Sequence, residues 1–194
     1  MQKLHSKGGV FVGDNFETSL KKSMDAYRRY VRPVIGRFIS GRLIVIEGKT
    51  DDELAEMFDQ CASIDIIRQS EKGLEGVASR IQFGHNWRTF TVRFKRDSGA
   101  RTEYEKLVYA YKNRLMCPKF TYQAYIENDA LSGLAVVETE SLLDYIEKHK
   151  PKVRHTGSSQ KGQASFYICP WDDIRTKGYK ILEYKGCKQT GAAV

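Results

Sequence analysis

Cysteine and proline are scarce in this sequence, with four of each among 194 residues. The cysteines are far apart and form no CxxC or Cys/His ligand spacing. This excludes a zinc ribbon and gives no sign of a disulfide framework. No hydrophobic run approaches the length of a membrane span, and the first residues lack the apolar segment of a secretory signal. We therefore expect a cytoplasmic protein with reduced thiols and no membrane partner.

Several catalytic motifs are also missing. There is no Walker-type phosphate loop, so ATP is not expected, and no GxSxG context for a hydrolase serine. The four histidines, His5, His85, His149 and His155, fall in predicted loops or tails without a partner at ligand spacing. A site built on histidine is therefore not indicated.

What the sequence does contain is an excess of positive charge. Lysine and arginine number 32 against 24 acidic residues, which makes a formal net charge of +8. Such a balance favours a polyanionic partner, nucleic acid in particular, although a basic surface can also serve solubility. With 41% hydrophobic residues, the chain is long enough for one good core.

Hydrophobic periodicity predicts a single α/β domain with a mixed central sheet flanked by helices. The domain is expected over residues 16–185 with its core at 51–126, after a flexible lead (1–15) and before a tail (186–194). Helices are predicted at 16–31, 51–61, 100–115, 139–146 and 171–175, and strands at 43–46, 63–67, 77–83, 90–94, 120–126, 133–137, 165–169 and 180–184. Pro33 should end or kink the first helix, Thr50 and Thr139 can cap helices, and residues 148–163 are predicted to be a mobile basic loop.

Five polar side chains interrupt the otherwise apolar strand patterns of the core. They are Asp65, Arg80, Gln82, Arg93 and Lys95. A side chain that cannot join the core needs another reason to be present. A phosphodiester-cleaving site would use a carboxylate, an amide and cations in this way. The alternative is structural, because Asp65 can bond backbone amides at a strand end and the others can lie on a solvated sheet face.

The helix, strands, helix and strand predicted for residues 51–126 resemble the common core of the PD-(D/E)XK nuclease superfamily, which includes many restriction enzymes and junction resolvases. The resemblance implies a restriction-endonuclease-like core and a Mg²⁺ (or Mn²⁺) ion. Asp65 matches the family's Asp, and Gln82 matches its acidic-or-Gln position. Glu53 or Glu56 would be the carboxylate that the preceding helix contributes, although Glu53 is equally explained as part of a capping box.

The sequence departs from the family where the motif places its lysine, because residue 84 is glycine. Arg80, or Lys95 and Arg93 on the next strand, could supply the positive charge instead, since the chemistry requires a cation near the attacked phosphate. Loss of activity is the alternative, which would leave a non-catalytic nucleic-acid-binding or regulatory protein on the same scaffold. A protein-interaction module is a further alternative.

A second resemblance covers about nine residues. The segment VIEGKTDDE resembles the first motif of Toprim domains, in which Glu47 would be the metal-side carboxylate. The family's DxD signature on a later strand is absent, because the only adjacent carboxylates downstream are Asp172 and Asp173. We therefore rank this metal-dependent class below the nuclease interpretation.

Two basic segments are candidates for contact with nucleic acid, expected to be DNA. The helix at 16–31 carries Lys21, Arg28 and Arg29 outside its apolar stripe, and the loop at 148–163 carries Lys150, Lys152 and Arg154. With Arg93 they form the predicted binding set. A solvated helix face and an unengaged connection are the structural alternatives. A homodimer or a protein partner is compatible with the sequence.

Overall fold

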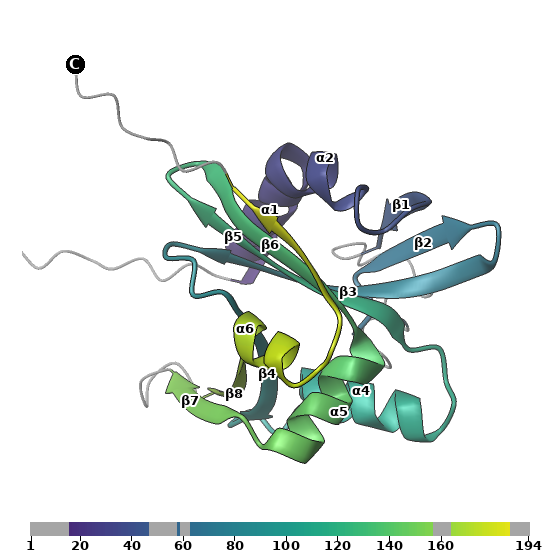
Figure 1. Cartoon of the computed structure of the whole chain (residues 1–194), viewed down its shortest axis with the longest axis vertical. Helices are drawn as coiled ribbons and strands as arrows, with labels where there is room; N and C mark the ends of the chain where they lie inside the picture. Colours follow the sequence, from purple (N-terminus) through teal and green to yellow (C-terminus); the bar gives the residue numbers. More distant parts are fainter. Residues whose placement is uncertain (1–15, 47–57, 59–62, 157–163, 187–194) are drawn as a thin grey trace, which may run out of the picture.

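The computed structural model of the chain describes residues 16–46, 58, 63–156 and 164–186 (Figure 1). Its centre is a six-stranded sheet with the strand order β1-β2-β3-β5-β6-β9. Neighbouring strands are antiparallel except β3 and β5, so the sheet is mixed. The strands are β1 (Arg42–Val45), β2 (Ile66–Ser70), β3 (Gly73–Phe83), β5 (Pro118–Glu127), β6 (Ala130–Glu138) and β9 (Ile181–Lys185). The predicted mixed α/β class is confirmed.

A second sheet lies against one face of the first. It consists of β4 (Thr89–Arg96), β8 (Ala164–Pro170) and β7 (Lys152–Thr156), all antiparallel in the order β4-β8-β7. The expectation that residues 90–94 belong to the central sheet is therefore wrong. The backbone of β4 pairs with β8, and its side chains Phe90 and Val92 pack against Tyr125 of β5.

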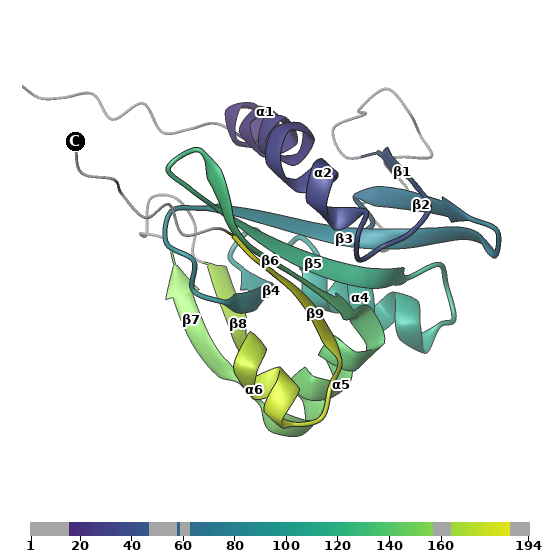
Figure 2. The same cartoon turned by 45° about the horizontal axis from the view of Figure 1, so that its top comes forward.

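The opposite face of the large sheet is covered by the N-terminal helices (Figure 2). These are α1 (Phe16–Ala26), a π-helical turn η1 (Tyr27–Val31) and α2 (Arg32–Ile35). Tyr27, Val31 and Ile35 are buried in an apolar cluster with side chains of the neighbouring strands β2, β3, β5 and β6. The helix at 16–31 is expected to end or kink at Pro33; the structure instead changes from the π-helical turn η1 to the short helix α2, and the proline lies in the first turn of α2, where helices tolerate it best.

Helices α4 (Glu103–Lys112), α5 (Thr139–His149) and α6 (Trp171–Thr176) lie on the same side of the large sheet as the second sheet (Figure 2). Trp171, the first residue of α6, is fully buried. It belongs to a large apolar cluster on this side of the sheet, together with Leu142, Phe90 and Tyr125. Two apolar layers therefore sandwich β5 and β6, which explains why both strands are almost continuously buried.

Three local predictions need correction. The strand expected at 63–67 runs from Ile66 to Ser70. Residues 69–76, which lie between the strands expected at 63–67 and 77–83, form a tight hairpin, and the Arg68–Glu75 ion pair joins its two strands. The N-cap of α5 is Glu138, not Thr139, because the Thr139 hydroxyl bonds that of Thr121 at 2.9 Å.

The predicted mobile loop at 148–163 is wrong for its first half. Residues Lys152–Thr156 form β7, whose backbone pairs with β8 from Ile168 to Ala164. The side chains of this short basic segment do not show that it is an edge strand, because the strand with which it pairs, β8, lies elsewhere in the sequence. Residues 157–163, the lead at 1–15, the tail beyond 186 and the helix expected at 51–61, apart from Phe58, lie outside the described residues.

Among the helices that the structure describes, none is long and apolar enough to cross a lipid bilayer.

Candidate functional site

Asp65 lies where β2 and β3 separate. The paired register of the two strands ends at Ile66 and Val77. Beyond it, the Asp65 N–H donates to the Val77 carbonyl at 3.1 Å, and the Asp65 carboxylate accepts the Ser79 N–H at 2.5 Å. No described strand pairs with this edge of β3 from Ser79 onward, so residues 79–83 form an open edge that begins at a carboxylate.

Two arginines converge beside the open edge. Arg80 forms an ion pair with Glu103, whose carboxylate also accepts the Arg93 N–H at 3.3 Å. Both guanidinium groups lie over the ring of Phe166, at 5.4 Å for Arg80 and 5.2 Å for Arg93. Burial lowers the pKa of Arg93, and the positive charges of Arg80 and Arg96 lower it further. The two guanidinium groups therefore lie on one aromatic ring with a single carboxylate paired to Arg80, and an anionic group placed beside them would be stabilised.

Gln82 belongs to a chain of buried polar contacts between the two sheets. Its amide nitrogen donates to the Thr91 hydroxyl at 3.4 Å, and the Thr91 N–H and hydroxyl both donate to Gln123 Oε1 at 3.2 Å. Gln123 is buried and is the register partner of Arg80 on β5. Because buried polar groups must be hydrogen-bonded, Gln82 and Thr91 help to hold β4 on the face of β3.

Gly84, where the nuclease resemblance expects a lysine, has a backbone conformation that disfavours a side chain. Its φ is +100°, while its N–H donates to the Ile126 carbonyl at 2.9 Å. A residue with a Cβ would be strained there although no atom stands in its way. The cation that the resemblance requires would therefore come from another position, and Arg80 and Arg93 line the hollow beside residues 79–81.

Three neighbouring hollows follow the open edge of β3, and we call them together the edge groove. The first, about 320 Å³, lies between α1 and residues 79–81; the second, about 590 Å³, lies between α1 and Phe83; the third, about 620 Å³, lies between β3 and the second sheet. The first and third hollows share Arg80 and Ile81 as lining residues, and the second and third share Phe83, so the hollows of the edge groove adjoin one another along β3. Its basic lining residues are Lys21, Lys22, Arg29, Arg80, Arg93 and Arg154.

The other predicted binding residues lie outside this groove. Lys95 is exposed beyond an irregularity in the β4–β8 pairing, and Arg28 faces Asp25 at 3.7 Å on the surface of α1. Lys150 is the exposed, left-handed C-cap of α5, and Lys152 is exposed at the start of β7. Glu53, Glu56 and the Toprim-motif residue Glu47 fall outside the described residues.

The predicted metal ligands are only partly described. Asp65 offers a carboxylate and Gln82 an amide oxygen, but Gln82 lies three residues beyond the Asp65 contact at Ser79, roughly 10 Å along an extended strand. No group of three or more His, Cys, Asp or Glu side chains that could hold an ion occurs in the described part of the chain. Mg²⁺ typically binds one or two carboxylates and completes its shell with water and phosphate oxygens, which one aspartate at an open edge fits.

Glu103 was missed by the sequence analysis, although a signal was present. Thr102 and Glu105 form a capping box in which the Thr102 side chain accepts the Glu105 N–H and Glu105 accepts the Thr102 N–H at 2.7 Å. This T-x-x-E pattern sets the start of α4 at residue 103, three residues later than the apolar period suggested. It thereby places Glu103 in the first turn, facing Arg80.

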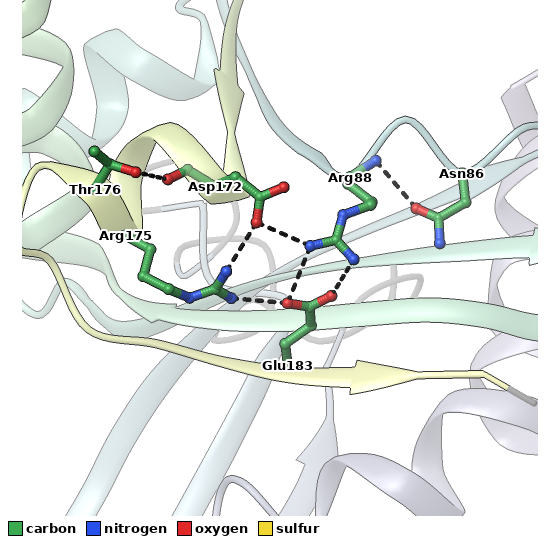
Figure 3. A network of polar contacts seen from close by, with 6 residues as sticks. All are labelled: Asn86, Arg88, Asp172, Arg175, Thr176 and Glu183. Carbon is green, nitrogen blue, oxygen red and sulfur yellow. Dashed lines mark hydrogen bonds and ion pairs between the residues drawn. The ribbon is translucent and has the colours of Figure 1, made fainter.

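A second charged network holds the loop between β3 and β4 (Figure 3). Arg88 contacts Glu183 of β9 at 2.6 Å and Asp172 of α6 at 3.0 Å, and Arg175 contacts the same two carboxylates at 2.8 Å. The Arg88 N–H donates to Asn86 Oδ1, and the Asn86 amide donates to the Ser132 carbonyl, both at 3.1 Å. The residue between these two anchors is Trp87, whose side chain is 60% exposed.

Comparison with known proteins identifies no relative: the chain matches no protein-family model, no curated protein and no solved structure.

Proposed function

We propose that the protein is a metal-dependent nuclease that cleaves phosphodiester bonds in nucleic acid, with DNA as the expected substrate, on a restriction-endonuclease-like core. The observation that carries the proposal is the position of Asp65 at the start of an open strand edge, beside Arg80 and Arg93. The Asp65 carboxylate, which can hold a divalent ion, accepts the Ser79 N–H at the start of this edge, and Arg80 and Arg93, which can bind a phosphate, line the hollow beside Ser79.

The chain's own groups have distinct roles in this proposal. Arg80 and Arg93 would bind the phosphate and offset the charge that develops on its oxygens. Glu103 holds the Arg80 guanidinium by an ion pair and the Arg93 backbone by its N–H before the substrate arrives. Asp65, with Glu56 as a further expected ligand, would hold Mg²⁺ or Mn²⁺, whereas Gln82, three residues beyond Ser79 and bonded to Thr91, is too far along the strand to share that ion. When bound, the ion supplies Lewis-acid stabilisation of the phosphate and a more acidic water.

The test is the substitution Asp65→Asn, which removes the charge and retains an oxygen that can accept the Ser79 N–H. Cleavage of plasmid, linear and single-stranded DNA in Mg²⁺ or Mn²⁺ should fall on the order of 10²–10³-fold, while the unfolding midpoint should change little. Glu147→Gln, which neutralises an exposed acid on α5, is the matched control and should keep full activity. Full metal-dependent cleavage by both Asp65→Asn and Asp65→Ala would overturn the proposal.

A non-catalytic nucleic-acid-binding protein is the second candidate, favoured by two observations. The position at which the nuclease resemblance expects a lysine is a glycine whose φ disfavours any side chain, and the Arg80 charge is already compensated by Glu103. This candidate predicts binding that weakens with salt, without turnover in Mg²⁺ or Mn²⁺ over long incubation. Asp65→Asn would then leave binding unchanged or slightly stronger, because it removes a negative charge from the groove.

A further inference from the structure

We propose that the edge groove binds an unpaired nucleic-acid strand and that Trp87 stacks on one of its bases. This inference rests on the proposed function for its substrate class, nucleic acid, and narrows that class to single strands. It follows from the rings that line the groove, from how the Trp87 loop is held, and from the distribution of charge along the open edge.

Aromatic surface is exposed at the end of the groove farthest from Asp65. Trp87 is 60% exposed and Phe83 is 41% exposed. His85 packs edge-on against Trp87, with ring centroids 4.5 Å apart and an interplanar angle of 79°, so a face of the indole remains available. Lys22 Nζ lies 4.4 Å from the centre of the Phe83 ring, which places a cation beside an aromatic surface. Aromatic rings alternating with cations are typical of surfaces that bind single strands.

The Trp87 backbone is held on both sides although its side chain is exposed. Asn86 is bonded to Ser132 on β6, and Arg88 is tied to Glu183 on β9 and to Asp172 on α6 (Figure 3). The Trp171 N–H also donates to the Arg88 carbonyl at 2.9 Å. A ring presented from a fixed backbone loses little conformational freedom when a ligand stacks on it. An exposed tryptophan without such anchoring would not indicate a binding role.

The charges in the groove favour contact with a backbone of phosphates. Lys21 and Lys22 of α1 and Arg29 of η1 line one side, together with the carboxylates of Asp25 and Asp129, while Arg154 lines the side formed by the second sheet. From Ser79 to Gly84 the open edge extends roughly 17 Å at about 3.3 Å per residue. This length accommodates several nucleotides between the arginine pair and Trp87. A strand in the groove would therefore meet cations along its phosphates and an aromatic ring at one base.

The rings discriminate between single strands and duplexes. In a duplex the faces of the bases are covered by their stacked neighbours. Exposed aromatic rings would therefore contribute no stacking energy to a groove that binds only duplex phosphates. An unpaired strand can turn a base onto Trp87. Because stacking is available to every base, binding should show little sequence preference.

Tryptophan fluorescence tests this directly, because the chain has two tryptophans and Trp171 is fully buried. In EDTA, which prevents metal-dependent cleavage, titration with a short oligothymidylate should quench the Trp87 emission.

Trp87→Ala should remove the quenching and weaken binding, measured by fluorescence anisotropy of a labelled oligonucleotide, by roughly 5- to 100-fold. Trp87→Phe should remove the quenching but keep most of the affinity. Leu74→Ala, which changes an exposed residue of the distant β2–β3 hairpin, is the control and should bind as the unchanged protein does.

A duplex of mixed sequence should bind more weakly than the single strand and should not respond to Trp87→Ala. An oligouridylate in place of the DNA distinguishes RNA from DNA, and preference for either single strand over its duplex supports the inference. Equal affinity for single strand and duplex, an unchanged affinity of Trp87→Ala, or no binding at all would overturn it. These results are independent of cleavage: quenching without turnover would reject the nuclease and keep the single-strand site, and turnover without quenching would do the reverse.

Discussion

Gly84 illustrates how one residue constrains the chemistry of the groove. At φ +100° a side chain of any kind is strained, so the position cannot supply the cation that the nuclease resemblance expects there. The same residue ends β3 and directs the chain toward the anchored Trp87 loop. The absence of a side chain at residue 84 and the turn into that loop therefore have a common backbone cause.

We expect Gly84→Ala to lower the free energy of unfolding by about 1–2 kcal/mol, from backbone strain alone, because nothing lies within 4 Å of the added Cβ. Urea unfolding of the two proteins measures the difference. Gly36→Ala is the matched control, since it also has open space around its Cβ but has φ −60°, and it should be neutral or slightly stabilising. Equal effects at the two glycines would refute the strain argument.

At the scale of elements, the start of α4 decides where the arginine pair finds its counter-ion. Thr102 is buried and accepts the Glu105 N–H, while Glu105 accepts both the N–H and the hydroxyl of Thr102. These hydrogen bonds favour the ionised carboxylate and lower the pKa of Glu105 below its ordinary value of 4.5. The helix start, and with it the position of Glu103, thus depends on a group that titrates in acid.

A lowered pKa in the folded state has a definite sign for stability. The contribution of Glu105 is fully present above pH 4.5 and is lost as the pH falls through its lowered folded-state pKa. We expect the difference in unfolding free energy between the unchanged protein and Glu105→Gln to shrink over that acidic range. Thr102→Ala removes hydroxyl contacts of Glu105 and should lower the free energy of unfolding by roughly 1 kcal/mol. It should also reduce the same pH dependence. A difference that stays constant from neutral pH to pH 3 would contradict this assignment.

At the scale of the whole molecule, the charged network of Figure 3 joins parts that the chain order keeps apart. Glu183 lies on the edge strand of the large sheet, Arg175 on the helix after the second sheet, and Arg88 in the loop between the sheets. The Glu183 side chain is 8% exposed, whereas that of Asp172 is 68% exposed, although both contact the same two arginines. Glu183, which is more buried, should therefore contribute more to the free energy of unfolding than Asp172 does.

We predict that Glu183→Gln lowers the unfolding free energy by about 1–3 kcal/mol, because two guanidinium groups lose a largely buried charged partner. Asp172→Asn, which removes an exposed charge from the same network, should change it by no more than about 0.5 kcal/mol. Chemical denaturation at low and high salt measures both. If the two substitutions had equal effects, the network would be a surface feature without a role in joining the sheets.

The elements themselves follow from local patterns in the sequence. Periods of two and of about 3.6 residues place β5, β6, β8, β9, α5 and α6 to within a few residues, because burial of one face imposes these periods on any segment. The polar interruptions at Asp65, Arg80 and Gln82 also stand out locally, since each lies in an apolar strand pattern. The excess of positive charge is likewise independent of how the chain folds.

The tertiary structure decided which strands pair and what the interruptions contact. A period of two shows that a segment is a strand but not which backbone N–H and C=O groups it meets, so neither the departure of β4 into a second sheet nor the pairing of β7 is visible in the sequence. The open edge beyond Ser79 exists because β2 leaves β3 at Asp65. Glu103 meets Arg80 from a distance of 23 residues along the chain. Contacts at such separations depend on the packing of whole elements, which no local pattern encodes.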